Sequence, residues 1–120
     1  MINKSCKKAL ILSISVLSLN ASADILASKE NLTRQCRDLS LSVASLISSQ
    51  ERHMCSEKLS QASGQIDRAG NSIIDDAYPV AKQELDSAVL ALQFAQLNSC
   101  NRYIQISHSK FEAQKIKNSL

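Results

Sequence analysis

The residues with the clearest chemistry are two cysteines placed almost symmetrically about the only proline of the chain. Cys55 lies 23 residues before Tyr78, and Cys100 lies 22 residues after it, with Pro79 following directly. If helices on both sides of this point fold back on each other, a rise of about 1.5 Å per residue brings the two thiols level to within about one residue. The spacing therefore predicts a disulfide between Cys55 and Cys100 that staples an antiparallel helical hairpin.

Closing that loop would matter energetically in a chain of this size. In the chain-entropy view, a cross-link over the 45 residues from Cys55 to Cys100 contributes at most roughly 4 kcal/mol, a large part of the stability of a small domain. Cys6 lies in an N-terminal stretch that has the features of a cleavable leader. Once that leader is removed, Cys36 is the one cysteine without a partner. We expect Cys36 to be buried and inert, the alternative being a thiol available to a second chain.

Other chemistry-bearing residues do not form a recognisable catalytic or metal-binding pattern. Only His53 and His108 could serve as bases, and the order of residues places neither beside a serine and an orienting acid. His53 and Cys55 would project about 200° apart on a helix, which argues against a shared metal. A haem held by Met54 and His108 is disfavoured because the two would lie roughly 9–10 Å apart along the axis. We expect no enzyme activity, no catalytic residue, no metal and no cofactor.

The N-terminal residues predict a cleavable secretory signal. Lys4, Lys7 and Lys8 precede a short apolar run over residues 9–19, and Ala-Ser-Ala ends at position 23. The run is too short to span a bilayer, so no stable membrane anchor is expected. We expect residues 1–23 to be the signal peptide and residues 24–120 to be one helical domain, secreted to the extracellular space or apoplast, or to a bacterial periplasm.

Removing the leader cancels the net charge. The formal net charge of +3 is carried by the three leader lysines, so residues 24–120 hold 11 basic and 11 acidic residues. No nucleic-acid partner is expected on this basis. The remaining charge is uneven. Acidic residues are concentrated over residues 75–86. Residues 102–117 contain four basic residues and one acidic residue, Glu112.

Apolar spacing after the leader is helical, with steps of three and four residues. It predicts three long helices, over residues 25–47, 50–76 and 79 to about 116. The fold expected is an all-α up-and-down bundle of these three helices, with a short fourth helix as an alternative. A capping box of Ser48 and Glu51 marks the first break. Tyr78-Pro79 marks the second, and a break at Gly70 is a competing interpretation that would rule out the disulfide.

Leucine alternating with alanine on the inner faces indicates close helix packing at shallow angles. The four aromatic side chains after the leader are expected in the core rather than at a stacking site; they are Tyr78, Phe94, Tyr103 and Phe111.

Five stretches together suggest a family. They are LSLSVASLISS at residues 39–49, a helix opened by Cys55, Asp-Ala-Tyr at 76–78, Glu-Leu-Asp-Ser-Ala-Val at 84–89, and Asn-Ser-Cys at 98–100. Over roughly residues 36–104 the chain resembles the secreted plant invertase and pectin methylesterase inhibitors. The resemblance implies a four-helix bundle whose second and third helices share a disulfide. It also implies stoichiometric blockade of the active-site cleft of a carbohydrate-active cell-wall enzyme.

The chain departs from the family pattern in several places. Cys36 stands alone where members carry a nearby cysteine pair, the Pro-Lys-Phe element is absent from the turn at Tyr78, and the span between the paired cysteines is slightly long. Only about twenty residues follow Cys100, too few for a complete fourth helix. An apolar groove left by that missing helix would favour dimerisation.

If the resemblance holds, the most polarised surface is the expected contact with the protein partner: Asp75, Asp76, Lys82, Glu84 and Asp86. The tripeptide Asn31-Leu-Thr is a glycosylation acceptor at Asn31 in a eukaryotic secretory route. The alternative class is a small bacterial periplasmic helical protein with a structural or accessory role.

Overall fold

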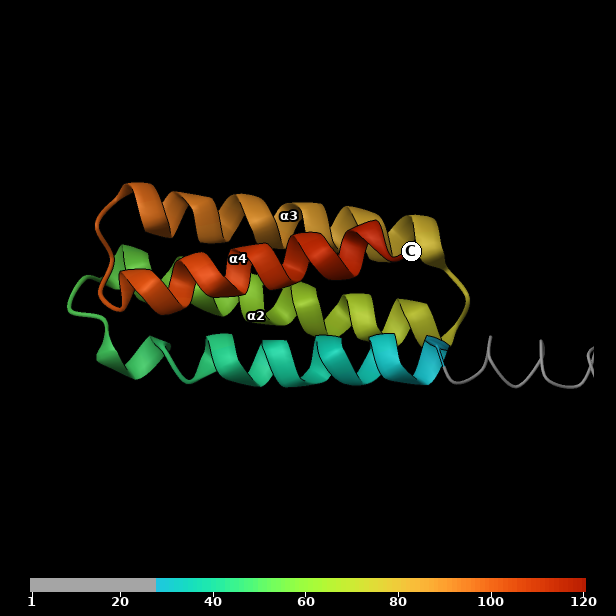
Figure 1. The fold of residues 1–120 in the computed structure, drawn as a ribbon. Helices are drawn as coiled ribbons and strands as arrows, with labels where there is room; N and C mark the ends of the chain where they lie inside the picture. The colour runs from blue at the N-terminus through green and yellow to red at the C-terminus, as the bar shows by residue number, and fades with distance from the viewer. Residues whose placement is uncertain (1–27) are drawn as a thin grey trace, which may run out of the picture. The chain divides into compact units, whose positions relative to one another are not determined.

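The computed structural model describes residues 28–120, which fold entirely into helices and their connections. The chain divides into two compact units, Met1–Glu30 and Asn31–Leu120. Of the first unit, only residues 28–30 are described, and they are helical. The predicted signal peptide and the predicted helix start at residue 25 lie outside the described residues. The second unit is a bundle of four helices running up and down (Figure 1).

The elements follow one another with short connections. The first helix occupies residues 28–44 of the described part and is followed by a 3-10 turn, η1 (Ile47–Ser49). Three further helices complete the bundle: α2 (His53–Ile74), α3 (Tyr78–Leu97) and α4 (Tyr103–Asn118). The predicted all-α bundle is confirmed, with α4 as its fourth helix.

The predicted single helix from residue 79 to about 116 is wrong. It is divided into α3 and α4 by a connection in which Ser99 and Arg102 adopt left-handed backbone angles, φ 56° and 67°. Helix α3 ends at its C-cap, Asn98, because the left-handed Ser99 turns the chain and the Cys100 N–H donates to the carbonyl of Ala95 at 3.1 Å, while the Asn98 side-chain amide donates to the carbonyl of Phe94 at 2.8 Å. Asparagine favours such helix ends, so Asn98 and Asn101 on either side of Cys100 were the available signal.

The break at Tyr78-Pro79 is confirmed. Helix α3 begins at Tyr78 with the proline in its first turn, where a missing N–H costs nothing. The competing break at Gly70 is wrong, since α2 continues through that residue to Ile74. The predicted capping box is also wrong. Helix α2 starts at His53, after both Ser48 and Glu51, and no side chain caps it.

The core lies along the inward stripe of each helix. It combines large and small side chains at helical spacing, as the sequence predicts: Leu32, Cys36, Leu39, Val43, Leu46, Cys55, Leu59, Ala62, Ile66, Ala69, Ile73, Ala81, Leu85, Ala88, Ala91, Leu92, Ala95, Cys100, Ile106, Ala113 and Ile116. Of the aromatic side chains, Tyr78 is half-buried and packs against this core, and Phe94 is half-buried. Tyr103 and Phe111 are exposed, so the expectation of core aromatics is wrong for these two.

The first helix and α2 approach each other closely at two points. A Cβ atom on Gly70 would lie 3.1 Å from the Cβ atom of Cys36, so only glycine fits there without a shift. Nearer the other end, Ser40 donates to the carbonyl of Ser63 at 2.8 Å, and Ser63 donates to the carbonyl of Ser40 at 2.9 Å. These small residues let the two helices pack at short range.

Candidate functional site

The predicted disulfide is present. Cys55 in the first turn of α2 and Cys100 just after α3 have their Cα atoms 5.6 Å apart and their sulfur atoms bonded. Both cysteines are almost completely buried. The reversal between Ile74 and Tyr78 places them level, as the residue count predicts. A buried disulfide with no exposed sulfur indicates a structural cross-link rather than a redox centre.

A polar clamp surrounds this end of the bundle, and sequence reasoning missed it. Gln50 donates to the carbonyl of Asn101 at 2.8 Å and accepts from its backbone N–H at 2.8 Å. The Asn101 amide donates to the carbonyl of Ser49 at 2.9 Å, and the Arg52 guanidinium donates to the carbonyl of Asn98. Four of these residues, Gln50, Arg52, Asn98 and Asn101, line an open hollow of about 380 Å³. Their polar groups bind one another, so the clamp joins two connections of the bundle.

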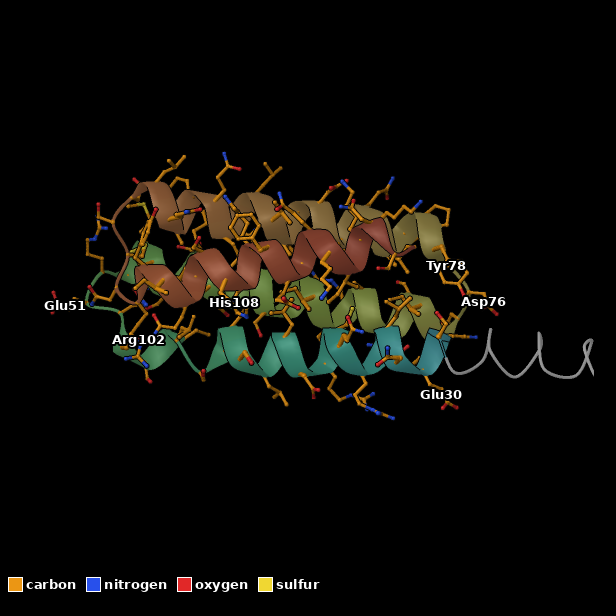
Figure 2. The ribbon with its side chains drawn as sticks, viewed as in Figure 1. Glu30, Glu51, Asp76, Tyr78, Arg102 and His108 are labelled. Atoms are coloured by element: carbon orange, nitrogen blue, oxygen red, sulfur yellow. A yellow bond between two sulfur atoms is a disulfide. The ribbon has the colours of Figure 1, made fainter. Side chains whose placement is uncertain are left out.

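The acidic residues of the expected partner surface begin at the opposite end, in the turn between α2 and α3. Asp75 and Asp76 are both exposed there, and Figure 2 shows Asp76 and Tyr78 at this end. Asp76 has a left-handed backbone, φ 59°, and its carboxylate accepts from the Tyr78 hydroxyl at 3.4 Å. This turn is therefore a compact acidic projection.

The other three residues of that surface divide between two sides of α3. Glu84 pairs with Arg68 of α2 at 3.4 Å, whereas Asp86 pairs with Lys117 of α4 at 2.6 Å. Lys82 is exposed one helical turn before Asp86. The structure thus groups Asp75 with Asp76, and Lys82 with Asp86, and directs Glu84 toward α2.

A groove between the first helix and α4 gathers polar side chains that are distant in sequence. Two hollows of about 390 and 240 Å³ share Ser42, His108 and Ser109. Asp38 and Glu112 lie at one end and Arg102 at the other; Figure 2 shows Arg102 and His108 on this side of α4. No hydrogen bond joins His108 to a serine or a carboxylate within residues 28–120.

The remaining sites singled out in the sequence are also placed. Cys36 is fully buried, as expected, and the alternative of a thiol open to a second chain is wrong. Burial and then the Asp67 carboxylate raise the pKa of the Cys36 thiol to about 11. Asn31 is exposed on the first helix. His53 is 94% exposed and lies 3.9 Å from Glu57.

Two searches over the described residues bear on ligands and membranes. Within residues 28–120, no group of three or more histidine, cysteine or acidic side chains is arranged to hold a metal ion. None of the helices described between residues 28 and 120 has the length and apolar character needed to cross a bilayer.

The prediction that a complete fourth helix is missing is wrong, and so is the prediction that its absence leaves an apolar groove. Helix α4 buries Ile106, Ala113 and Ile116 in the core. Comparison with known proteins finds no matching family model, no matching curated protein and no matching solved structure.

Proposed function

We propose that this chain is a non-enzymatic binding protein that inhibits a carbohydrate-active cell-wall enzyme, an invertase or a pectin methylesterase, by occupying its active-site cleft. The observation that carries the proposal is the disulfide between α2 and α3 inside a four-helix bundle. This is the architecture that the resemblance implies. Helix α4 supplies the element whose absence would have argued against it.

Rigidity supports an inhibitory role. The disulfide and the hydrogen bonds between Gln50 and Asn101 fix the connections at one end of the bundle. A binding surface that is already ordered loses little conformational entropy when it meets its partner. The bundle can therefore present a fixed surface to an enzyme cleft.

The acidic turn is the contact surface that we favour. Asp75 and Asp76 project from the end of the bundle, and Lys82 is exposed nearby on α3. Glu84 and Asp86 are engaged by Arg68 and Lys117 on the sides of the bundle. Asp75 and Asp76 are exposed next to each other at its end, so we expect inhibition to depend mainly on these two residues.

The compartment belongs to the same proposal. A structural disulfide forms and persists in oxidising environments such as the extracellular space or the periplasm. Together with the leader expected over residues 1–23, it supports secretion. In a bacterial source the same scaffold would work in the periplasm.

The test is titration of the purified chain into an invertase and a pectin methylesterase, with residual activity as the readout. A variant carrying Asp75→Lys and Asp76→Asn reverses the charge of the turn from −2 to +1, and asparagine tolerates the left-handed backbone at position 76. We expect stoichiometric inhibition by the wild type and a strong loss in this variant.

A matched control carries Glu51→Lys and Glu57→Gln, which make the same change in charge at exposed positions near the disulfide end. This control should inhibit as the wild type does. Absence of inhibition of both enzymes by the wild-type chain would contradict the proposed function. Equal loss in both variants would contradict the contact surface.

A further inference from the structure

Helix α4 carries apolar side chains on two opposite sides. Ile106, Ala113 and Ile116 face the core, as a bundle helix requires. Ile104 and Phe111 are nevertheless 77% and 62% exposed. They are seven residues apart and so lie on one stripe of the helix. We call this stripe, with His108 and Lys115 at the intervening and following positions, the outer strip of α4. Packing within the chain does not account for it.

The charge around the outer strip is positive. Lys115 is exposed on the strip, and the Lys110 ammonium lies 5.6 Å from the centre of the Phe111 ring. Glu112 follows Phe111 directly and lines the groove toward the first helix together with His108, and Asp86 is paired with Lys117. Two exposed apolar side chains with two lysines beside them, and with one carboxylate at the edge of the groove, complement a surface whose headgroups are anionic and whose interior is apolar.

We propose that the outer strip of α4 docks on an anionic lipid bilayer, with Ile104 and Phe111 entering the interface and Lys110 and Lys115 lying at the headgroups. Long lysine side chains can reach headgroup phosphates while an adjacent ring is buried. An acidic polysaccharide would satisfy the lysines but would leave the isoleucine and phenylalanine in water, so the bilayer fits the strip better. With two apolar side chains and two lysines, the association is weak and reversible.

The outer side of α3 offers a matched control. Leu90 and Leu97 are also seven residues apart and are 66% and 75% exposed. The neighbouring charges there are Lys82 and the ion pair of Asp86 with Lys117, and the exposed residues around them include Gln83 and Gln93. This side is as apolar as the outer strip of α4, but a carboxylate lies among its lysines and engages one of them. Anionic lipid should distinguish the two.

The experiment measures co-sedimentation of the chain, produced without the leader expected over residues 1–23, with two kinds of vesicle at low salt. One kind contains phosphatidylglycerol and phosphatidylcholine, and the other contains phosphatidylcholine alone. Lys110→Gln with Lys115→Gln should lower the partition coefficient roughly 20-fold, about five-fold for each lysine. Ile104→Ser with Phe111→Ser should also abolish most binding. Leu90→Ser with Leu97→Ser should bind as the wild type, and every variant carries the same N-terminal residues.

Added salt should weaken wild-type binding, because the attraction to headgroups is screened. Circular dichroism will confirm that the exposed substitutions leave the bundle folded. Failure of the wild type to bind anionic vesicles would overturn the inference. So would equal binding to phosphatidylcholine alone, equal binding by the strip variants, or binding to polygalacturonate without binding to vesicles. Enzyme inhibition is a separate readout, so either proposal can fail without the other.

Discussion

Gln50 and Asn101 hydrogen-bond each other twice although they are 51 residues apart. The Gln50 amide donates to the Asn101 carbonyl and accepts from the Asn101 N–H, both at 2.8 Å. The side chain of Gln50 thus satisfies both backbone groups of Asn101 in the connection between α3 and α4. The pair lies beside the disulfide and ties the connection before α2 to the one before α4.

Gln50→Ala is expected to destabilise the protein by about 1–3 kcal/mol, because it leaves the N–H and carbonyl of a part-buried connection without their partner. Gln50→Glu should destabilise as well, since it keeps the acceptor for the Asn101 N–H but sets a carboxylate oxygen against the carbonyls of Leu46 and Asn101. The measurement is the free energy of unfolding in urea. Gln83→Ala, at an exposed position on α3, is the control and should be nearly neutral. Equal stability of Gln50→Ala and wild type would show that the clamp adds nothing.

The two glycines of α2 are expected to respond in opposite directions to alanine. At Gly64 a new Cβ would meet only the flexible end of Arg68 at 3.4 Å, so Gly64→Ala should stabilise by about 0.5–1 kcal/mol through helix propensity. At Gly70 it would lie 3.1 Å from the Cβ of Cys36. Gly70→Ala should forfeit that gain, and Gly70→Val should destabilise by about 1–3 kcal/mol through overpacking.

Thermal melts of the three variants check this expectation, with each glycine serving as the control for the other. The first helix must move away from α2 if Gly70 gains a side chain. A stabilisation by Gly70→Ala as large as that by Gly64→Ala would show that the two helices are not held in close contact.

Cys36 predicts a loss of stability at alkaline pH. Its thiol keeps the proton to about pH 11 in the folded state, against an ordinary pKa of 9.0. Between these values the unfolded chain binds fewer protons than the folded one, so stability falls as pH rises from about 9 toward 11. The informative quantity is the difference between wild type and Cys36→Ala in the slope of stability against pH.

We expect Cys36→Ala to be less stable at neutral pH, because it leaves a small cavity, but to lose less stability above pH 9. In the same series, a thiol reagent should modify wild-type Cys36 only on unfolding. Rapid labelling of the folded protein at pH 8 would contradict the burial of this thiol.

Much of the fold was predictable because it follows from periodicity. Positions such as Leu59 and Ile66, or Leu85 and Leu92, recur every seven residues and lie in the core. The proline fixed the reversal before α3, and counting residues from it gave the disulfide. These are local rules with a single dominant cause, and tertiary context did not override them.

The end of α3 was missed because the apolar rhythm continues across it. The left-handed Ser99 and the bond from the Cys100 N–H to the Ala95 carbonyl end the helix, and backbone features of this kind leave little trace in a hydropathy pattern. The clamp of Gln50 and Asn101 was missed for a related reason: its partners meet only after the bundle has formed. The groove that brings Asp38, Ser42 and His108 together likewise depends on the placement of α4.

The composition of the acidic surface was predictable, but its division was not. Residues 84 and 86 project to opposite sides of a helix, and which neighbour each one meets depends on the bundle. Glu84 finds Arg68 on α2, and Asp86 finds Lys117 on α4. Exposed pairs of this kind contribute about 0.2–1 kcal/mol each, so their consequence is mainly to remove free charge from the surface.

Removing the disulfide with Cys55→Ala and Cys100→Ala is expected to lower the free energy of unfolding by about 2–4 kcal/mol, because the unfolded chain regains the freedom of a long loop. The double variant should still fold, since the α2–α3 packing and the bonds of Gln50 remain. Reduction of the wild type should reproduce the loss in stability. Cys36→Ala keeps the disulfide, so reductant should destabilise it as well. Circular dichroism during urea unfolding, with and without reductant, measures the stability of the wild type, the double variant and Cys36→Ala. A reduced wild type as stable as the oxidised one would show that the cross-link is dispensable. The rigidity that the proposed inhibition requires would then have to come from helix packing and the bonds of Gln50.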